Sequence, residues 1–352
     1  MKMIAPCDIA LGLAGLPFKM SAAMMLDIAK RSVSAPSYEE LQSLYRKDRN
    51  IEISDDQLRL VTNYIGKLVY DDDCLRRDQA LDHFKNRKKY RRKKSGTLYI
   101  VTKSATLNIR TENGSARKEN WLGLVFSSKN IRIIQSESGQ EYRKILTREY
   151  VGLIGNAAAF GEHLYEAALR NGLEEHERIA VISDGNPGIK SFLTTYCSEL
   201  DVIQILDYSH LKENVFRFAA AGISGGEETK TAWGARLMEL IAAGRISEAM
   251  KMAEPFKDFK REGVSNIRAY LDSNKDCIDY PAYVKNGLFT DSDAIETGNG
   301  NMMRERLKLP GRRWDAQTAQ YVLSAKMKYD SGLWDSYVVP LSYRRLGLRP
   351  PR

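Results

Sequence analysis

The chain has 352 residues, of which 43% are apolar and 28% are charged. A chain of this length and composition can bury a sizeable core, which excludes intrinsic disorder and fibrous repeats and leaves room for two or three domains. Its uncharged apolar stretches are too short to span a membrane, and its N-terminus lacks the pattern of an export signal, so we expect neither a membrane protein nor an exported one.

The cysteines and histidines are too scattered to form a metal site. Four cysteines (Cys7, Cys74, Cys197 and Cys277) include no CxxC pair, and four histidines at distant positions form no zinc-ligand pattern. A disulfide framework and a zinc ribbon are therefore excluded, and reduced thiols in a cytoplasmic protein are expected.

Positive charge is concentrated in one stretch. Lys and Arg total 54 against 45 Asp and Glu, which gives a net charge of +9, and residues 85–94 hold eight basic residues and no acid. Such a run suits either a solvated linker or the neutralisation of nucleic-acid phosphates, and the sequence alone leaves both open. The candidate DNA-binding residues of this basic run are Lys85, Arg87, Lys88, Lys89, Arg91, Arg92, Lys93 and Lys94.

The first 84 residues carry a helical pattern. Apolar residues recur at helical spacing within Ser37–Arg46, and Ser54 followed by Gln57 is a capping box that predicts the start of a second helix. Its expected buried stripe is Leu58, Val61, Ile65 and Leu68. Two helices with a short connection are compatible with a DNA-reading helix-turn-helix, and equally with an ordinary helical hairpin.

The periodicity changes to that of strands after the basic run. Strands are predicted from Leu98 to about Ile109, over Trp121–Phe126 and over Ile131–Ile134, with a turn at Asn113-Gly114 between the first two. These segments predict a three-stranded antiparallel meander.

Helices and strands then alternate. The predicted elements are a helix over 156–173, a strand over 179–182, a helix over 189–196, a strand over 202–206 and a helix over 209–221. The order β-β-β-α-β-α-β-α favours an α/β protein with an RNase H-like mixed sheet. The predicted division is a helical domain (1–84), a basic linker (85–96), the RNase H-like core (97–221), an all-helical insertion (222–290), a C-terminal helical part of the core (291–340) and a flexible tail (341–352).

A sheet of this kind can hold two divalent cations for phosphoryl transfer when acids stand on its first strand, on the strand after the meander and on a late helix. Mg²⁺ or Mn²⁺ would be the cofactor, because hard cations prefer carboxylate oxygens. Asp184, at the end of a buried strand, and Glu296 are candidates, although each residue taken alone is better explained as a turn Asp and as an acid near a helix start. His210 is a further candidate, with a capping or core role as its alternative.

Several motifs occur together in a fixed order along the chain. They are Leu11-Gly-Leu-Ala-Gly-Leu-Pro-Phe-Lys-Met20, Lys118-Glu-Asn-Trp-Leu-Gly-Leu-Val-Phe-Ser-Ser128, Ile182-Ser-Asp-Gly185, Gln204-Ile-Leu-Asp-Tyr-Ser-His-Leu-Lys-Glu-Asn214, Ala294-Ile-Glu-Thr-Gly-Asn299, Arg306-Leu-Lys308, Gly311-Arg-Arg-Trp314, Thr318-Ala-Gln-Tyr-Val-Leu323 and Ser331-Gly-Leu-Trp334. This series resembles the bacterial insertion-sequence transposases of the Lre and Kra types, which are Mutator-like members of the DDE class. The resemblance covers nearly the whole chain.

The resemblance implies roles for individual residues. Asp184 and Glu296 take the second and third carboxylate positions and would ligate the metal, and Asp207 and His210 take an Asp-x-x-His element near the active site. The segment that would face DNA contains Arg304, Arg306, Arg312, Arg313 and Trp314. The implied partners are double-stranded DNA at transposon ends and at the target, bound by a homo-oligomer, which places the protein at the bacterial nucleoid.

The first carboxylate position departs from the family pattern. The family strand reads approximately Tyr-Ile-x-x-Asp-Gly, whereas this chain has Lys103-Ser104 at its end. A lysine cannot ligate a cation and repels it. We therefore expect a protein that binds DNA with an incomplete catalytic site; the alternatives are an active transposase with another acid in place, a non-catalytic DNA-binding protein and an RNase H-like nuclease.

Overall fold

The computed structural model describes residues 13–87, 95–111, 114–135, 141–292 and 315–350, together with Ala10 and Gly139. Its main helices are α2 (Ala22–Ser34), α3 (Tyr38–Arg49), α4 (Asp55–Asn86), α5 (Ala157–Arg170), α6 (Gly188–Tyr196), α7 (Tyr208–Gly222), α8 (Glu227–Ala242), α9 (Ile246–Ala253), α10 (Ile267–Asn274), α11 (Tyr280–Lys285), α13 (Ala316–Asp330) and α14 (Val339–Arg345). Its strands are β1 (Thr97–Thr111), β2 (Gly114–Ser127), β3 (Ile131–Gln135), β4 (Glu141–Ile145), β5 (Glu149–Ile154), β6 (Arg178–Ser183) and β7 (Val202–Leu206). Within these ranges, no helix has both the length and the apolar composition that crossing a membrane requires.

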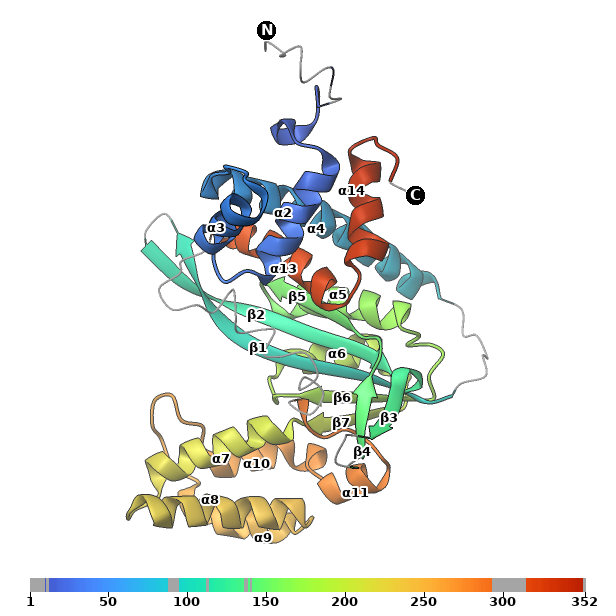
Figure 1. The fold of residues 1–352 in the computed structure, drawn as a ribbon. Coiled ribbons are helices and arrows are strands. Elements are labelled where there is room, and N and C mark those ends of the chain that lie inside the picture. Colours follow the sequence, from blue (N-terminus) through green and yellow to red (C-terminus); the bar gives the residue numbers. More distant parts are fainter. Residues whose placement is uncertain are drawn as a thin grey trace.

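A five-stranded mixed sheet forms the centre of the molecule, in the order β5-β2-β1-β6-β7 (Figure 1). β2 is antiparallel to both β1 and β5, while β6 is parallel to both β1 and β7. The long β1–β2 hairpin closes where Thr111 pairs with Gly114, whose positive φ of 125° suits glycine. The α/β class and the strands β1, β2, β6 and β7 confirm the corresponding predictions.

The third antiparallel strand is not the one predicted. Ile131–Ile134 belongs to β3, which pairs only with β4 in a separate two-stranded sheet, and β5 takes the place beside β2. β5 is held there by α13, because the Gln320 amide accepts a hydrogen bond from the Ile154 amide (2.8 Å) and donates one to the Gly152 carbonyl (3.2 Å). A helix that satisfies the outer backbone groups of β5 closes this edge of the sheet.

Both faces of the sheet are covered. Side chains such as Ile100 and Val181 pack with α5 and α6 on one face, while Val101 and Ile182 pack with the helices α7–α11 on the other. The strands therefore read as continuous apolar runs, as strands buried on both faces do. Figure 1 shows α7–α11 beyond the β7 edge of the sheet and the N-terminal and C-terminal helices beyond the β5 edge.

The N-terminal helices share a core with the end of the chain. Met25 of α2 and Ile65 of α4 belong to the same buried cluster as Trp334 and Leu341. The tail predicted to be flexible from residue 341 thus begins as α14, with Leu341 only 1% exposed. The arginines and prolines near Leu341 are typical of a solvated tail, but Leu341 packs with Met25 and Ile65, which are far away in the chain.

Helix α4 is longer than the sequence suggested. The capping box is present, since the Ser54 hydroxyl accepts a hydrogen bond from the Gln57 amide (3.2 Å). Leu58, Val61 and Ile65 are buried as predicted, but Val69 and not Leu68 continues the stripe, because 3.6 residues per turn advance the buried face over a helix of 32 residues. The reading of α3 and α4 as a helix-turn-helix stays a prediction.

Candidate functional site

The parallel pairing of β1 with β6 and of β6 with β7 ends at the same level of the sheet, while β1 continues beside β2. The last registered pairs are Thr102 with Ser183 and Ser183 with Leu206. The residues that follow are Lys103, Asp184 and Asp207, one on each neighbouring strand or directly after it. Because side chains alternate along a strand, Lys103 and Asp184 project from the sheet face that packs against α7–α11. The carboxyl ends of parallel strands are where open α/β sheets hold their ligands.

Asp184 is held by hydrogen bonds on both carboxylate oxygens. Its Oδ2 accepts from the Ser104 amide (3.1 Å) and from the Ser104 hydroxyl (3.0 Å), while its Oδ1 accepts from the Asn186 amide (3.0 Å). The Asn186 side chain in turn donates to the Ser104 hydroxyl (2.9 Å). The side chain expected to be a metal ligand is therefore fixed by its own turn and by β1.

Asp207 is the most deeply buried acid of the cluster, with 1% of its surface exposed. Burial raises its pKa above the usual Asp range, while hydrogen bonds from Ser292 and the positive charge of Lys103 act in the opposite direction. The Ser292 amide donates to Oδ1 (3.2 Å) and the Ser292 hydroxyl to Oδ2. Asp207 thus joins β7 to the chain segment that ends the helical insertion.

Lys103 contributes charge and no carboxylate to this cluster. It lies close enough to Asp207 to lower that acid's pKa, and it stands where the resemblance places the first metal ligand. Two carboxylates that are already hydrogen-bonded, with an ammonium beside them, do not fit a pair of divalent cations. Among the residues described, no group of three or more His, Cys, Asp or Glu side chains could hold a metal ion.

The insertion helix α10 closes over the cluster, which the sequence did not reveal. Burial is the main cause that raises the pKa of Tyr270 to about 12; a hydrogen bond with Asn214 opposes this shift and the negative charges of Asp184 and Asp207 add to it. A Cβ atom on Gly185 would come within 3.0 Å of the Asn274 side chain, so glycine allows α10 to approach. These contacts join residues more than 60 positions apart, and no local pattern predicts them.

The remaining predicted site residues have different outcomes. His210 lies half-buried in the first turn of α7, and its side chain makes no hydrogen bond within the described ranges. Of the basic run, Lys85 and Arg87 are described; Arg87 lies over the Phe84 ring (4.5 Å) and 3.9 Å from Glu199. The predicted residues that lie outside the described residues are Lys88, Lys89, Arg91, Arg92, Lys93, Lys94, Glu296, Arg304, Arg306, Arg312, Arg313 and Trp314.

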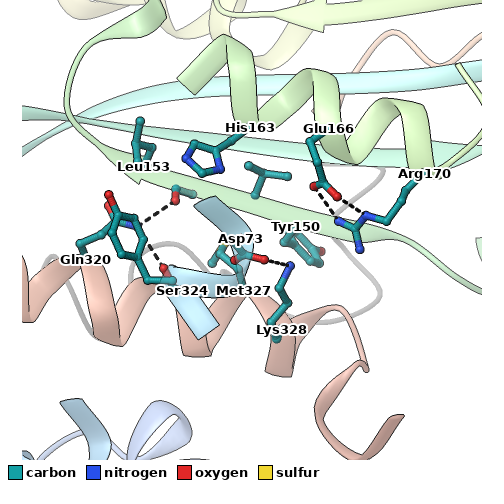
Figure 2. A pocket seen from close by; sticks show the side chains of 13 residues that line it. Asp73, Tyr150, Leu153, His163, Glu166, Arg170, Gln320, Ser324, Met327 and Lys328 are labelled. Atoms are coloured by element: carbon teal, nitrogen blue, oxygen red, sulfur yellow. Dashed lines mark hydrogen bonds and ion pairs between the residues drawn. The ribbon is translucent and has the colours of Figure 1, made fainter. Parts of the chain in front are cut away.

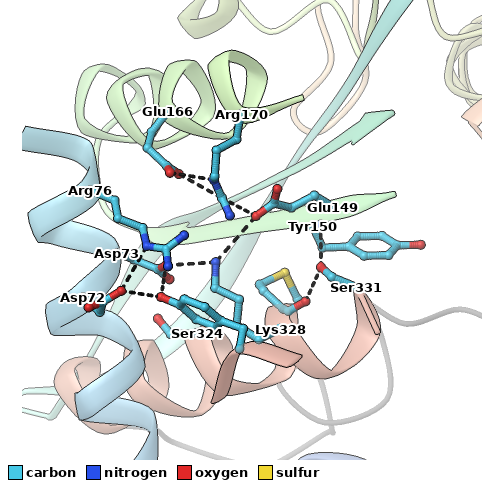
Figure 3. Close-up of polar contacts among 12 residues, drawn as sticks. Asp72, Asp73, Arg76, Glu149, Tyr150, Glu166, Arg170, Ser324, Lys328 and Ser331 are labelled. Carbon is cyan, nitrogen blue, oxygen red and sulfur yellow. Dashed lines mark hydrogen bonds and ion pairs between the residues drawn. The ribbon is translucent and has the colours of Figure 1, made fainter. Parts of the chain in front are cut away.

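A second group of charged residues fills the space between α4, α5, β5 and α13 (Figure 3). Lys328 is 2.9 Å from Asp73 and 3.6 Å from Glu149, and Arg170 pairs with both Glu149 and Glu166. Lys328 and Glu149 are both buried. Because each cation faces acids and each acid faces a cation, this ion network joins four elements and leaves little charge for a ligand.

His163 borders the same space, with its ring directed toward the pocket in Figure 2. Burial lowers its pKa from 6.5 to about 4, and the charges of Arg77 and Lys328 lower it while those of Asp73 and Asp78 raise it. The ring is therefore neutral at pH 7 in the folded protein, whereas it takes up a proton near pH 6.5 when unfolded.

The free energy of unfolding should therefore decrease as the pH falls below about 6.5. The unfolded state binds the additional proton, so the loss from His163 amounts to about 2 kcal/mol at about pH 5. Urea unfolding of the wild type and of His163→Gln across this pH range measures it. The variant should lose most of the slope, while His83→Gln, which changes an exposed histidine, should keep it. An equal slope in all three proteins would contradict the shift.

No protein-family model matches the chain, and comparison with curated proteins gives no significant match. The resemblance to DDE transposases therefore rests on the ordered sequence motifs and stays a prediction.

Proposed function

We propose that this chain is a DNA-binding protein derived from a DDE transposase with an RNase H-like core, in which the catalytic edge no longer assembles a two-metal site. The observation that carries the proposal is that Lys103, Asp184 and Asp207 each directly follow the last parallel pair of β1, β6 and β7, so they lie at one level of the sheet, with β1 continuing beyond Lys103 in its pairing with β2. The strand order β5-β2-β1-β6-β7, with only β2 reversed, is also the order that an RNase H-like sheet requires.

The position of Asp184 supports its assignment to the second carboxylate position of the family. An Asp at the end of the first strand after the meander is where the resemblance expects the second carboxylate, and β6 ends one residue before it. The hydrogen bond between Ser292 and Asp207 gives further support for the third carboxylate position. It attaches to this cluster a residue that precedes Glu296 by four positions in the sequence.

The positive charge of Lys103 supports the proposal that this site no longer binds metal. An ammonium group within a few ångströms of a divalent cation repels it by several kcal/mol at the effective dielectric of a protein surface. In its present place it partly compensates Asp207, so it stabilises the metal-free arrangement of the acids. DNA binding then depends on the net charge of +9 and on the basic run.

Replacing Lys103 by aspartate should create a response to metal that the wild type lacks. At a Mn²⁺ concentration about ten times the Kd, linkage stabilises the variant by about 1.4 kcal/mol, which raises Tm by about 2 °C. Thermal unfolding with and without Mn²⁺ measures this, and strand nicking of duplex DNA gives a second signal.

Two control variants make this experiment specific. Lys103→Met removes the charge without adding a carboxylate and should not respond to Mn²⁺. Lys103→Asp combined with Asp184→Asn should lose the response. If Mn²⁺ stabilises the wild-type protein, or if the wild-type protein nicks DNA without a substitution at Lys103, the proposal is contradicted and an active transposase or nuclease is favoured.

A further inference from the structure

The β3–β4 hairpin touches the body through Arg143 and Ile145 of one face, although Ile133 on that face is 69% exposed. On the anchored face, Arg143 donates a hydrogen bond to the Gly287 carbonyl (2.7 Å) and lies 4.0 Å from the centre of the Phe289 ring. Ile145 is buried on the same face, where it pairs with Ile131. These contacts fix the hairpin, so its other face is presented in a defined orientation.

The other face is basic and partly aromatic. The pairing places Arg132 opposite Lys144 and Ile134 opposite Tyr142, and we call these four residues the outer face. Arg132 and Lys144 are exposed and Tyr142 is 49% exposed. The Arg132 guanidinium donates through Nη1 to the Lys129 carbonyl (3.2 Å) and the Ile131 carbonyl (3.1 Å). The nearby acid, Glu141, pairs with Gln135 and projects from the anchored side.

Two like charges directly opposite each other destabilise a hairpin by a fraction of a kcal/mol to about 1 kcal/mol. A polyanion placed over Arg132 and Lys144 would remove that cost and add favourable charge pairing. The outer face therefore fits a partner with closely spaced negative charges.

The location of the hairpin identifies the partner's chemistry. The Thr97 amide, at the start of β1, donates to the Ser128 hydroxyl (2.9 Å), and a Cβ on Gly96 would lie 3.9 Å from the Lys129 side chain. The start of β1, which follows the basic run in the sequence, thus lies beside the base of the hairpin, and Figure 1 shows β3 and β4 at the end of the sheet where β1 begins.

We infer that the outer face of the β3–β4 hairpin contacts the phosphate backbone of double-stranded DNA, next to the DNA bound by the basic run. The inference rests on the proposed DNA-binding function. A two-stranded β-ribbon is narrow enough to enter a DNA major groove, and Arg and Lys at one level of the ribbon can reach adjacent phosphates. The contact lies at the end of the sheet opposite to Lys103 and Asp184.

The test is the salt dependence of duplex binding by Arg132→Gln/Lys144→Gln, measured by fluorescence anisotropy with a mixed-sequence duplex. Each lost phosphate contact removes about 0.9 from the slope of log K against log salt, so the double variant should lose about 1.8 and each single variant about half of that. The substituted residues are exposed, so the fold should be retained.

The matched control is Lys251→Gln/Lys257→Gln, which removes the same charge from exposed positions in the helical insertion and should keep the wild-type slope. A wild-type slope in the hairpin variant would overturn the inference and leave DNA binding intact, whereas a wild type that fails to bind duplex would refute the proposed function itself. Loss of binding to phosphatidylserine vesicles with an unchanged DNA slope would also overturn it and assign the face to membranes.

Discussion

Replacing Lys88, Lys89, Arg91 and Arg92 by glutamine should weaken duplex binding and reduce its salt slope by about 3.6. Four of the eight basic residues of the run are lost, and each contact with a phosphate releases about 0.9 of a counterion on binding. The measurement is a titration of labelled duplex between about 50 and 300 mM salt.

A control of equal charge separates specific contacts from net charge. Lys251, Lys257, Lys260 and Lys275 are exposed residues in the helical insertion, and their replacement by glutamine also removes four positive charges. The control protein should keep the wild-type slope. If both proteins lose the same amount, overall charge and not the basic run determines binding, and the run is then a linker.

Lys328→Met should lower the free energy of unfolding by about 3 kcal/mol, because it removes the buried cation that faces Asp73 and leaves Glu149 with Arg170 alone. The energetic cost is that of an uncompensated buried charge and not of a lost surface pair. Urea unfolding followed by circular dichroism measures the change.

The matched control for this change is Lys30→Met, which breaks an exposed pair with Asp335 and should cost at most about 1 kcal/mol. Adding Asp73→Asn to Lys328→Met should recover part of the loss, because the acid that faced Lys328 becomes neutral. Equal effects of Lys328→Met and Lys30→Met would show that the ion network does not hold α4, β5 and α13 together.

Local signals in the sequence predicted much of the fold. β7 has the predicted bounds, and the Ser54–Gln57 capping box starts α4, because short apolar strands and helix caps depend on neighbouring residues. The placement of Asp184 at a strand end could also be predicted, since β6 and its turn are defined by adjacent residues.

The errors concern residues whose role depends on distant partners. β5 contains Glu149 and Gly152, which look unsuited to a buried strand until Lys328 and Leu323 of α13 are placed against them. Leu341 was assigned to a tail for the same reason. In the candidate site, Ser104 and Ser292 bind Asp184 and Asp207, but a serine carries no sequence signal for such a role.

The most direct test of the account is to incubate the wild-type protein with end-labelled duplex DNA and Mn²⁺ and to measure both retention and strand integrity. The account predicts that the duplex is bound in a salt-dependent manner, that Mn²⁺ does not change the affinity, and that both strands stay intact. Metal-dependent nicking would contradict the role given to Lys103, and a duplex that is not bound at low salt would contradict the DNA-binding function.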